Sequence, residues 1–194
     1  MHNILYIGSC AKSGTHFVVE FLNRLGVQVQ HEYPGRHGIV TWYIYHTPAQ
    51  FPNELIIDVD NSICLHQTRD PLLTISSLML LDDESWRYIR RAIGMDLSQP
   101  ILYRCMEYYS RWNRALEDCS FQYKVEEIEE LLDILDLFQI LYNKDNISAA
   151  MQTPRLGRTQ SKKPSLSWDD LYAEDYTLAD NIRIMGVDYG YNCV

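Results

Sequence analysis

The chain has 194 residues, a formal net charge of −9, 46% hydrophobic residues and 22% charged residues. A chain of this length and composition fits one globular domain. Its acidic balance argues against a general nucleic-acid binder, because such proteins carry a basic footprint. No hydrophobic run approaches the ~20 residues of a membrane span, and the sequence opens on a strand-like segment instead of a signal peptide, so we expect no membrane partner.

Strand-like and helical segments alternate along the chain. Apolar and β-branched runs predict strands at 3–8, 27–29, 39–45, 56–59, 62–66 and 121–125. Helical periodicity predicts helices at 17–25, from Leu72 onward, at 101–116, 126–137 and 168–185. This alternation predicts the α/β class: a single three-layer P-loop NTPase-like domain over residues 1–194, with a mostly parallel central sheet flanked by helices.

Residues 146–167 lack periodicity and contain Pro154, Gly157 and Pro164, which predicts a long flexible loop. Its charged residues are all cations: Arg155, Arg158, Lys162 and Lys163. In an acidic protein, such a loop is either a flap over an anionic ligand or a plain solvated loop.

The five cysteines are odd in number and lack CxxC spacing, and the six histidines lack paired-ligand spacing. The cysteines therefore predict reduced, mostly buried thiols in a cytoplasmic protein. We expect no bound metal.

The segment from Gly8 to Thr15 has the length of a Walker A loop and joins an expected strand to an expected helix. Where nucleotide hydrolases carry the lysine before Ser/Thr, this chain has Gly14, and its lysine, Lys12, comes two residues earlier. Backbone N–H groups of such a loop can still cradle an anion, helped by the helix dipole. The pattern argues against an ATPase, GTPase or kinase of the usual type, and the alternative is an ordinary turn.

A second cation follows the expected strand at 62–66. Arg69 begins the sequence Arg69-Asp70-Pro71, and Ser77 follows in the next helix. An arginine fork suits phosphate oxygens, and the carboxyl ends of parallel strands are where ligands bind in open sheets. Arg69 and Ser77 could therefore hold one phosphate, or Arg69 could pair structurally with Asp70 or a helix end.

These two motifs together resemble the family of sulfotransferases that use 3′-phosphoadenosine-5′-phosphosulfate (PAPS). Lys12-Ser13-Gly14-Thr15 resembles the core of that family's phosphosulfate loop, and Arg69-Asp70-Pro71 with Ser77 resembles its 3′-phosphate motif. Fainter echoes cover most of the chain, and His31-Glu32 looks most like bacterial members. In the family, the stretch at 39–45 tends to open a helix, which competes with the strand that its composition predicts.

The resemblance implies how the donor would be bound. The loop, with Lys12, Ser13, Gly14, Thr15 and His16, would hold the 5′-phosphosulfate, and Lys12 would stabilise charge on the leaving phosphate. Arg69 and Ser77 would bind the 3′-phosphate. The product would be 3′-phosphoadenosine-5′-phosphate (PAP), and no metal would be required. Arg155-Leu-Gly157-Arg158 remotely echoes a C-terminal motif of the family that covers the nucleotide.

The resemblance also implies a general base, for which His31 and Glu32 lead and His46 and His66 are alternatives. The acceptor would be a hydroxyl or amine on a small molecule or glycan, and the oligomeric state stays open. Ala11 and His16 depart from the family's usual residues, and the chain is short for it. A divergent P-loop nucleotide kinase and a catalytically inactive nucleotide-binding relative are the competing hypotheses.

Overall fold

The structure is a computed structural model that describes residues 4–42, 62–154 and 163–193. The chain divides into two compact units. The sheet unit comprises Met1–Thr68 and Leu116–Gly157, and the helical unit comprises Arg69–Ala115 and Arg158–Val194. The single domain expected over residues 1–194 stays a prediction.

The sheet unit is built on five parallel strands in the order β2-β3-β1-β4-β5. They are β1 (Ile4–Ser9), β2 (Val29–His31), β3 (Gly38–Thr41), β4 (Ser62–Thr68) and β5 (Phe121–Lys124). This confirms the α/β class and the parallel sheet. The expected strand at 56–59, and residues 43–45 of another, lie outside the described residues.

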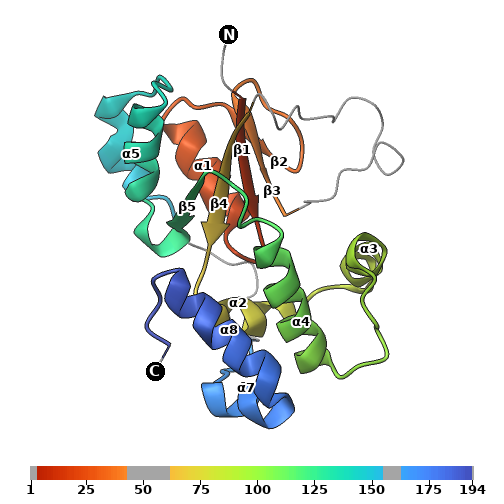
Figure 1. Ribbon diagram of the computed structural model, residues 1–194. Helices are drawn as coiled ribbons and strands as arrows, with labels where there is room; N and C mark the ends of the chain where they lie inside the picture. Colours follow the sequence, from red (N-terminus) through yellow and green to blue (C-terminus); the bar gives the residue numbers. More distant parts are fainter. Residues whose placement is uncertain (1–3, 43–61, 155–162, 194) are drawn as a thin grey trace. The chain divides into compact units, whose positions relative to one another are not determined.

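One face of the sheet forms the main core of this unit. Leu5 pairs in register with Ile63, and Ile7 with Leu65, so their side chains share one face. Helices α1 (Thr15–Arg24) and α5 (Glu130–Leu137) pack on that face, as Figure 1 shows, and contribute Phe21, Leu22, Leu131, Ile134 and Leu135. The opposite face carries Tyr6 and Ile39, which are also buried.

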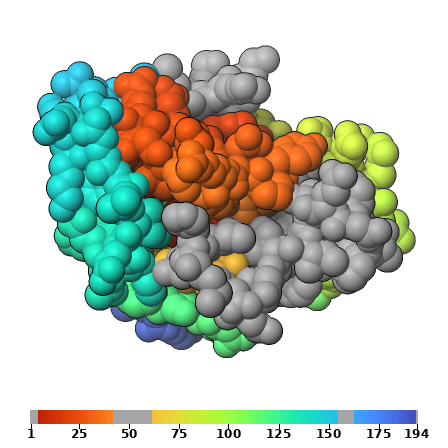
Figure 2. Space-filling model, turned by 90° about the horizontal axis from the view of Figure 1, so that it is seen from above, coloured from red at the N-terminus to blue at the C-terminus, as the bar shows by residue number. Residues whose placement is uncertain are grey.

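The end of α1 is tied to a later segment of the same unit. The backbone N–H of Asn143 donates to the carbonyl of Leu25 at 2.8 Å, and the amide of Asn146 donates to that of Arg24 at 3.0 Å. Figure 2 shows the corresponding surfaces, orange and cyan, side by side. These hydrogen bonds join the end of α1 to residues 143–146, which are distant in sequence.

Two predictions for this segment need correction. The expected helix at 126–137 is a 3₁₀ turn, η3 (Val125–Glu127), followed by α5. The expected loop at 146–167 begins with η4 (Lys144–Asn146) and α6 (Ile147–Met151), because Ala150 is buried in the main core and holds the short helix there. Tertiary burial therefore overrides the weak local pattern.

The helical unit contains α2 (Pro71–Leu78), α3 (Asp83–Ile93), α4 (Ile101–Arg114), α7 (Trp168–Glu174) and α8 (Tyr176–Asp188). Aromatic rings fill part of its core, with Tyr108 and Trp112 4.8 Å apart between ring centroids. The expected helix at 168–185 is divided at Asp175, whose carboxylate accepts the Leu178 N–H and so caps α8. Helix α3 was not predicted.

A disulfide joins Cys64 in β4 to Cys119, which precedes β5. The expectation that all five cysteines are reduced is therefore wrong for this pair, because a separation of 55 positions in sequence hides how close the two cysteines lie in the fold. Cys10, Cys105 and Cys193 are buried thiols, as expected. Among the described residues, no helix is long and apolar enough to cross a membrane, and the cytoplasmic location stays a prediction.

Candidate functional site

The carboxyl ends of the strands bring most of the candidate residues of the sheet unit together. From β1 the chain continues to β2 on one side of the sheet, whereas β4 and β5 lie on the other side. The order therefore reverses between β1 and β4, and such a switch point is where open α/β sheets bind ligands. The segment Cys10–Gly14, between β1 and α1, lies at this point.

This segment, which we call the phosphate loop, has an unusual backbone. Lys12 has a φ of 66° and Gly14 a φ of 92°, whereas the intervening Ser13 is not in the positive-φ region. The Ser13 N–H donates to the Cys10 carbonyl at 3.2 Å. Turns that contain left-handed residues are one way in which a backbone presents N–H groups to an anion.

Gly14 has two roles in the loop. It is the N-cap of α1, where it provides no side chain to accept the first helical N–H groups. A Cβ at this position would lie 3.3 Å from Cγ2 of Val125 and would be strained by the positive φ. The start of α1 is therefore an uncapped helix N-terminus, which favours an anion.

The side chains around the loop divide by exposure. Ser13 and Thr15 are 1% and 6% exposed, whereas Lys12 is exposed. Ser9 ends β1 fully buried, and within the described residues its Oγ has no hydrogen-bond partner. This buried hydroxyl directly precedes the loop and calls for a polar partner.

A buried network braces the loop from β4 and β5. Gln67 donates from Nε2 to the Ser13 carbonyl at 2.7 Å, and Tyr123 donates its hydroxyl to Oε1 of Gln67 at 3.0 Å. Burial raises the pKa of Tyr123 well above its ordinary value, so its hydroxyl keeps its proton as a donor. Thr68 adds a 3.2 Å bond to the Tyr123 carbonyl. The amide of Gln67 is thereby fixed in one orientation.

A second set of polar contacts reaches the loop from β2. Oγ1 of Thr15 lies 2.8 Å from Nε2 of His31, and Nδ1 of His31 lies 3.5 Å from Oε1 of Glu32. The indole N–H of Trp42 donates to the same Glu32 oxygen. The rings of His16 and His31 stack with centroids 3.9 Å apart. These contacts bring His16, His31 and Glu32 together beside Thr15.

Backbone strain concentrates at the same edge. Among the described residues, the non-glycine positions with positive φ are Lys12, Glu32 and Gln139. The first two belong to the phosphate loop and to the end of β2. Such conformations are unfavourable for residues with a Cβ, and they persist at functional sites where the surroundings enforce them.

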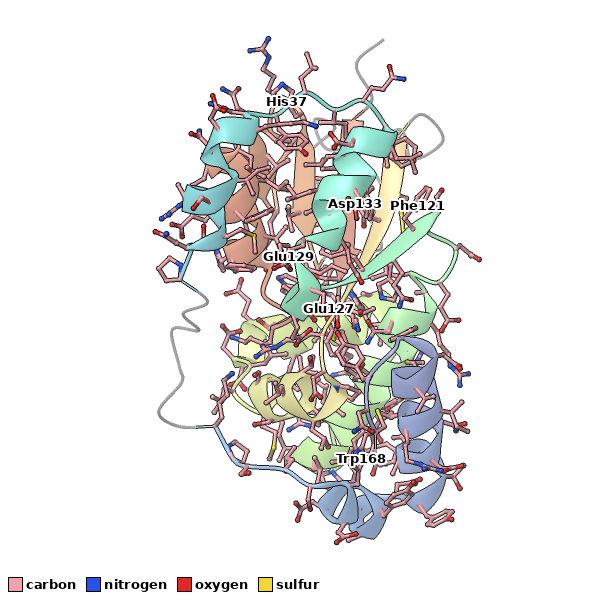
Figure 3. The ribbon with its side chains drawn as sticks, turned by 90° about the vertical axis from the view of Figure 1, so that its left-hand side faces the viewer. His37, Phe121, Glu127, Glu129, Asp133 and Trp168 are labelled. Carbon is pink, nitrogen blue, oxygen red and sulfur yellow. A yellow bond between two sulfur atoms is a disulfide. The ribbon has the colours of Figure 1, made fainter. Side chains whose placement is uncertain are left out.

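A further cation lies at the end of β5. Lys124 pairs with Glu127 on η3 at 2.5 Å, and this bond holds the pKa of Glu127 below its ordinary value. Figure 3 labels Glu127 at this end of the sheet unit and His37 at the opposite end. Lys124 is thus a cation paired with a carboxylate of the same unit.

Comparisons with known proteins were made for the whole chain. No family model matches it, and no curated protein matches it. Among solved structures, the chain is similar to the mouse sulfotransferase SULT7A1 complexed with PAP. The identity is 14% and the TM-score 0.44, over 79% of this chain and 64% of that one, so the chain spans less than two thirds of that protein's length.

The remaining described candidates belong to the helical unit. Arg69 is half-buried, and its carbonyl accepts the Tyr109 hydroxyl at 3.4 Å. Asp70 is the N-cap of α2 and accepts the Leu73 N–H at 2.9 Å. The Ser77 hydroxyl donates to the Leu73 carbonyl at 2.7 Å. Asp70 and Ser77 therefore hydrogen-bond within their own helix.

Some residues that the sequence predicted lie away from the site or outside the described residues, whereas others near the loop were not predicted. Arg155, Arg158 and His46 lie outside the described residues, and His66 is buried in β4. The sequence interpretation gave no role to Ser9, Gln67, Trp42 and Tyr123. A signal existed for Gln67, because a glutamine at the end of a buried strand needs a polar partner. Within 4–42, 62–154 and 163–193, no group of His, Cys, Asp or Glu gathers as metal ligands.

Proposed function

We propose that the protein is a sulfotransferase that moves a sulfuryl group from PAPS to a hydroxyl or amine. The observation that carries the proposal is the phosphate loop: a backbone with positive φ at Lys12 and Gly14, braced by Gln67, before an uncapped helix, with glycine in place of the Walker lysine. Lys12-Ser13-Gly14-Thr15 resembles the phosphosulfate loop of this family. A loop without the Walker lysine suits a phosphosulfate better than a triphosphate.

In this proposal the loop binds the 5′-phosphosulfate, with N–H groups at the start of α1 and the hydroxyls of Ser13 and Thr15 as donors. The acceptor oxygen or nitrogen forms a bond to sulfur while the bond from sulfur to the bridging phosphate oxygen breaks. The bonding electron pair stays on that oxygen, which becomes part of PAP. Lys12 stabilises the developing charge, and positioning supplies much of the remaining acceleration.

The acceptor proton must pass to a base, and Glu32 is the better of the two expected candidates. His31 directs Nε2 at Thr15, so this nitrogen faces the loop instead of an acceptor. Glu32 is oriented by the Trp42 indole N–H and by its positive-φ backbone. A carboxylate fixed in this way can receive a proton from a bound hydroxyl or amine.

The 3′-phosphate distinguishes PAPS from ATP, and we assign it to Arg69 and Ser77. The support is their match to the family's 3′-phosphate motif and the suitability of an arginine fork for phosphate. Ser77 would have to turn its hydroxyl proton from the Leu73 carbonyl to the ligand. Arg155 and Arg158 are proposed to cover the nucleotide. The acceptor is proposed to be a small molecule or glycan, and the protein to act in the cytoplasm.

A thermal-shift titration with PAP, AMP, ADP and ATP with magnesium tests the proposal. A ligand at about 100 times its dissociation constant adds about 2.7 kcal/mol to the free energy of unfolding. We expect PAP to raise the melting temperature at lower concentration than the other nucleotides. Preference for ATP with magnesium would instead support a nucleotide kinase, and no response to any nucleotide would contradict a donor site.

Transfer itself is then measured with PAPS and a panel of hydroxyl and amine acceptors, by following PAP release. Release that depends on an acceptor supports the enzyme. Tight binding of PAP without turnover of PAPS, either to acceptors or to water, would identify a catalytically inactive relative.

A further inference from the structure

His31 has a polar neighbour at each of its ring nitrogens beside the phosphate loop. Its Nε2 lies 2.8 Å from Oγ1 of Thr15, and its Nδ1 lies 3.5 Å from Oε1 of Glu32. Thr15 is only 6% exposed and stands at the first position of α1. The direction of the hydrogen bond between Thr15 and His31 therefore depends on the tautomer and the protonation state of one imidazole, and the Glu32 carboxylate near Nδ1 favours the neutral tautomer with its proton on that nitrogen.

The two protonation states have opposite consequences for Thr15. A neutral His31 with its proton on Nδ1, toward the Glu32 carboxylate, accepts at Nε2 and takes the hydroxyl proton of Thr15. A protonated His31 donates from Nε2 to Oγ1, so the Thr15 proton must point elsewhere. The phosphate loop adjoins Thr15, and an anion bound there would receive this proton as a charge-assisted hydrogen bond.

We infer that His31 is a positioning residue that sets the direction of the Thr15 hydroxyl proton, and that the loop binds the donor's anionic group more tightly when His31 is protonated. The inference deepens the proposed function and rests on it for the identity of the donor. It needs only the phosphate loop and an anion for its own test.

Neighbouring groups act on His31 from several elements. From its own segment, Glu32 favours the imidazolium, and Trp42 holds the Glu32 oxygen in place. From α1, the stacked ring of His16 is a second titratable group, and two stacked imidazolium rings repel each other. From β3, the register partner of His31 is the apolar Val40. If His31 is protonated while His16 stays neutral, His31 is attracted to Glu32 and is not repelled by His16.

The inference fixes the sign of a pH effect. Because the anion prefers the protonated state, affinity rises as the pH falls through the titration of His31. By linkage, a bound anion moves the titration midpoint of His31 to higher pH by the same factor. We expect a shift of about one pH unit, which corresponds to a tenfold change in affinity.

The test uses inorganic sulfate, which keeps its charge between about pH 5.5 and 8, whereas phosphate groups titrate near pH 6. Histidine NMR signals of the full chain are followed against pH without and with saturating sulfate. In the wild type and in Thr15→Ser, sulfate is expected to raise the His31 midpoint by about one pH unit. In Thr15→Val, which keeps the shape and lacks the hydroxyl, the shift should fall to less than half.

Two histidine variants separate His31 from its neighbour. His31→Gln should bind sulfate with an affinity that no longer depends on pH, whereas His16→Asn should retain the dependence, because His16 stacks on the ring. Equal shifts in Thr15→Ser and Thr15→Val would overturn the inference, since charge alone would then explain the effect. Unchanged pH dependence in His31→Gln would also overturn it.

The sulfate experiment and the nucleotide titration can fail separately. If sulfate shifts the His31 midpoint but PAP is not preferred over other nucleotides, the positioning role stands and the PAPS assignment fails. If PAP is preferred but sulfate leaves His31 unmoved, the donor site stands and the positioning role is overturned. Near-ultraviolet circular dichroism of each variant confirms that it is folded.

Discussion

The phosphate loop of the sheet unit and the start of α2 in the helical unit are both helix N-termini that follow a strand, yet their polar groups are arranged differently. At α2, Asp70 caps the helix and Ser77 donates to a carbonyl of its own helix. At α1, Gly14 provides no cap, and Gln67 holds the loop from outside through the Ser13 carbonyl. The first turn of α1 therefore has no side-chain cap.

The difference shows how a fold separates a preorganised site from an ordinary helix start. A capped N-terminus gains stability from its own side chain, typically about 1 kcal/mol, and has less to offer an anion. An uncapped and braced N-terminus gives up that stability and keeps donors in place for binding. The positive φ of Lys12 is a further cost in stability at the same loop, as is common at binding sites.

The largest expected effect comes from the tip of the loop. Lys12→Met keeps the length of the side chain and removes its charge, so transfer should fall by about 10²–10³-fold. The Kd for PAP should change by less than about tenfold, because most contacts to the ground state come from backbone N–H groups. The matched control is Lys124→Met, since Lys124 is already paired with Glu127. Equal losses of transfer and PAP affinity in Lys12→Met would contradict the proposal that Lys12 acts on the leaving phosphate during transfer.

The next effect tests whether α2 also binds phosphate. If Arg69 holds the 3′-phosphate, Arg69→Ala should weaken PAP binding by about 10–100-fold, as expected for charged hydrogen bonds. Sulfate binding at the loop should not change. Ser77→Ala should have a smaller effect in the same direction, and Ser76→Ala, whose hydroxyl donates to the Pro164 carbonyl, is its control. Calorimetric titration that shows equal PAP affinity in Arg69→Ala and wild type would refute the assignment.

The brace of the loop gives a smaller effect on stability. Gln67→Leu leaves the Ser13 carbonyl and the Tyr123 hydroxyl without their present partner, which should lower the free energy of unfolding by about 1–3 kcal/mol. Sulfate affinity should fall as well, because the loop loses its fixed shape. The control is Thr74→Val in α2, because Thr74 is fully buried and within the described residues its Oγ1 has no hydrogen-bond partner.

Chemical denaturation and sulfate titration measure both consequences. Loss of stability in Gln67→Leu with unchanged sulfate affinity would show that the brace stabilises the fold and does not shape the site. Tyr123→Phe, which removes only the hydroxyl, should show the same two effects at smaller size.

The smallest effect concerns the capped helix α7. Hydrogen bonds from the hydroxyl and backbone N–H of Ser167 hold the pKa of Asp170 below its ordinary value. A depressed folded-state pKa contributes stability above the unfolded pKa of about 3.9, and this contribution is lost as the pH falls through the folded value. Ser167→Ala should lower the melting temperature by about 2–4 °C at neutral pH and reduce its decline in acid. A change in sulfate affinity in this variant would contradict the view that the cap of α7 stabilises its helix without affecting the phosphate loop.

Local sequence signals predicted the strand, loop and helix that form the site. The strand ends near Gly8, apolar residues recur at helical spacing in α1, and Gly26 with a φ of 84° follows that helix. The same reasoning predicted a helix from Leu72 onward, and α2 begins one residue earlier, at Pro71. These features depend on the intrinsic preferences of nearby residues, which a single sequence displays directly.

Contacts between residues far apart in sequence could not be predicted from local sequence signals. The bond between Tyr123 and Gln67 joins residues 56 positions apart, and the disulfide of Cys64 and Cys119 spans 55. Both depend on β4 pairing with β5, which no local pattern specifies. Helix α3 is different, because its signals were present: Asp82 caps it, and Gly94 follows it with a φ of 68°.

The most direct test of the account is an amide NMR titration of the full chain with PAP. We expect the backbone signals of Ser13, Gly14, Thr15 and His16 to shift together, with a single Kd, because the phosphate loop and the start of α1 would surround the 5′-phosphate. Larger shifts for these amides with PAP than with an equal concentration of AMP would add support for the 3′-phosphate contact. Saturable binding that leaves these four amides unmoved would contradict the central claim that the phosphate loop is the donor site.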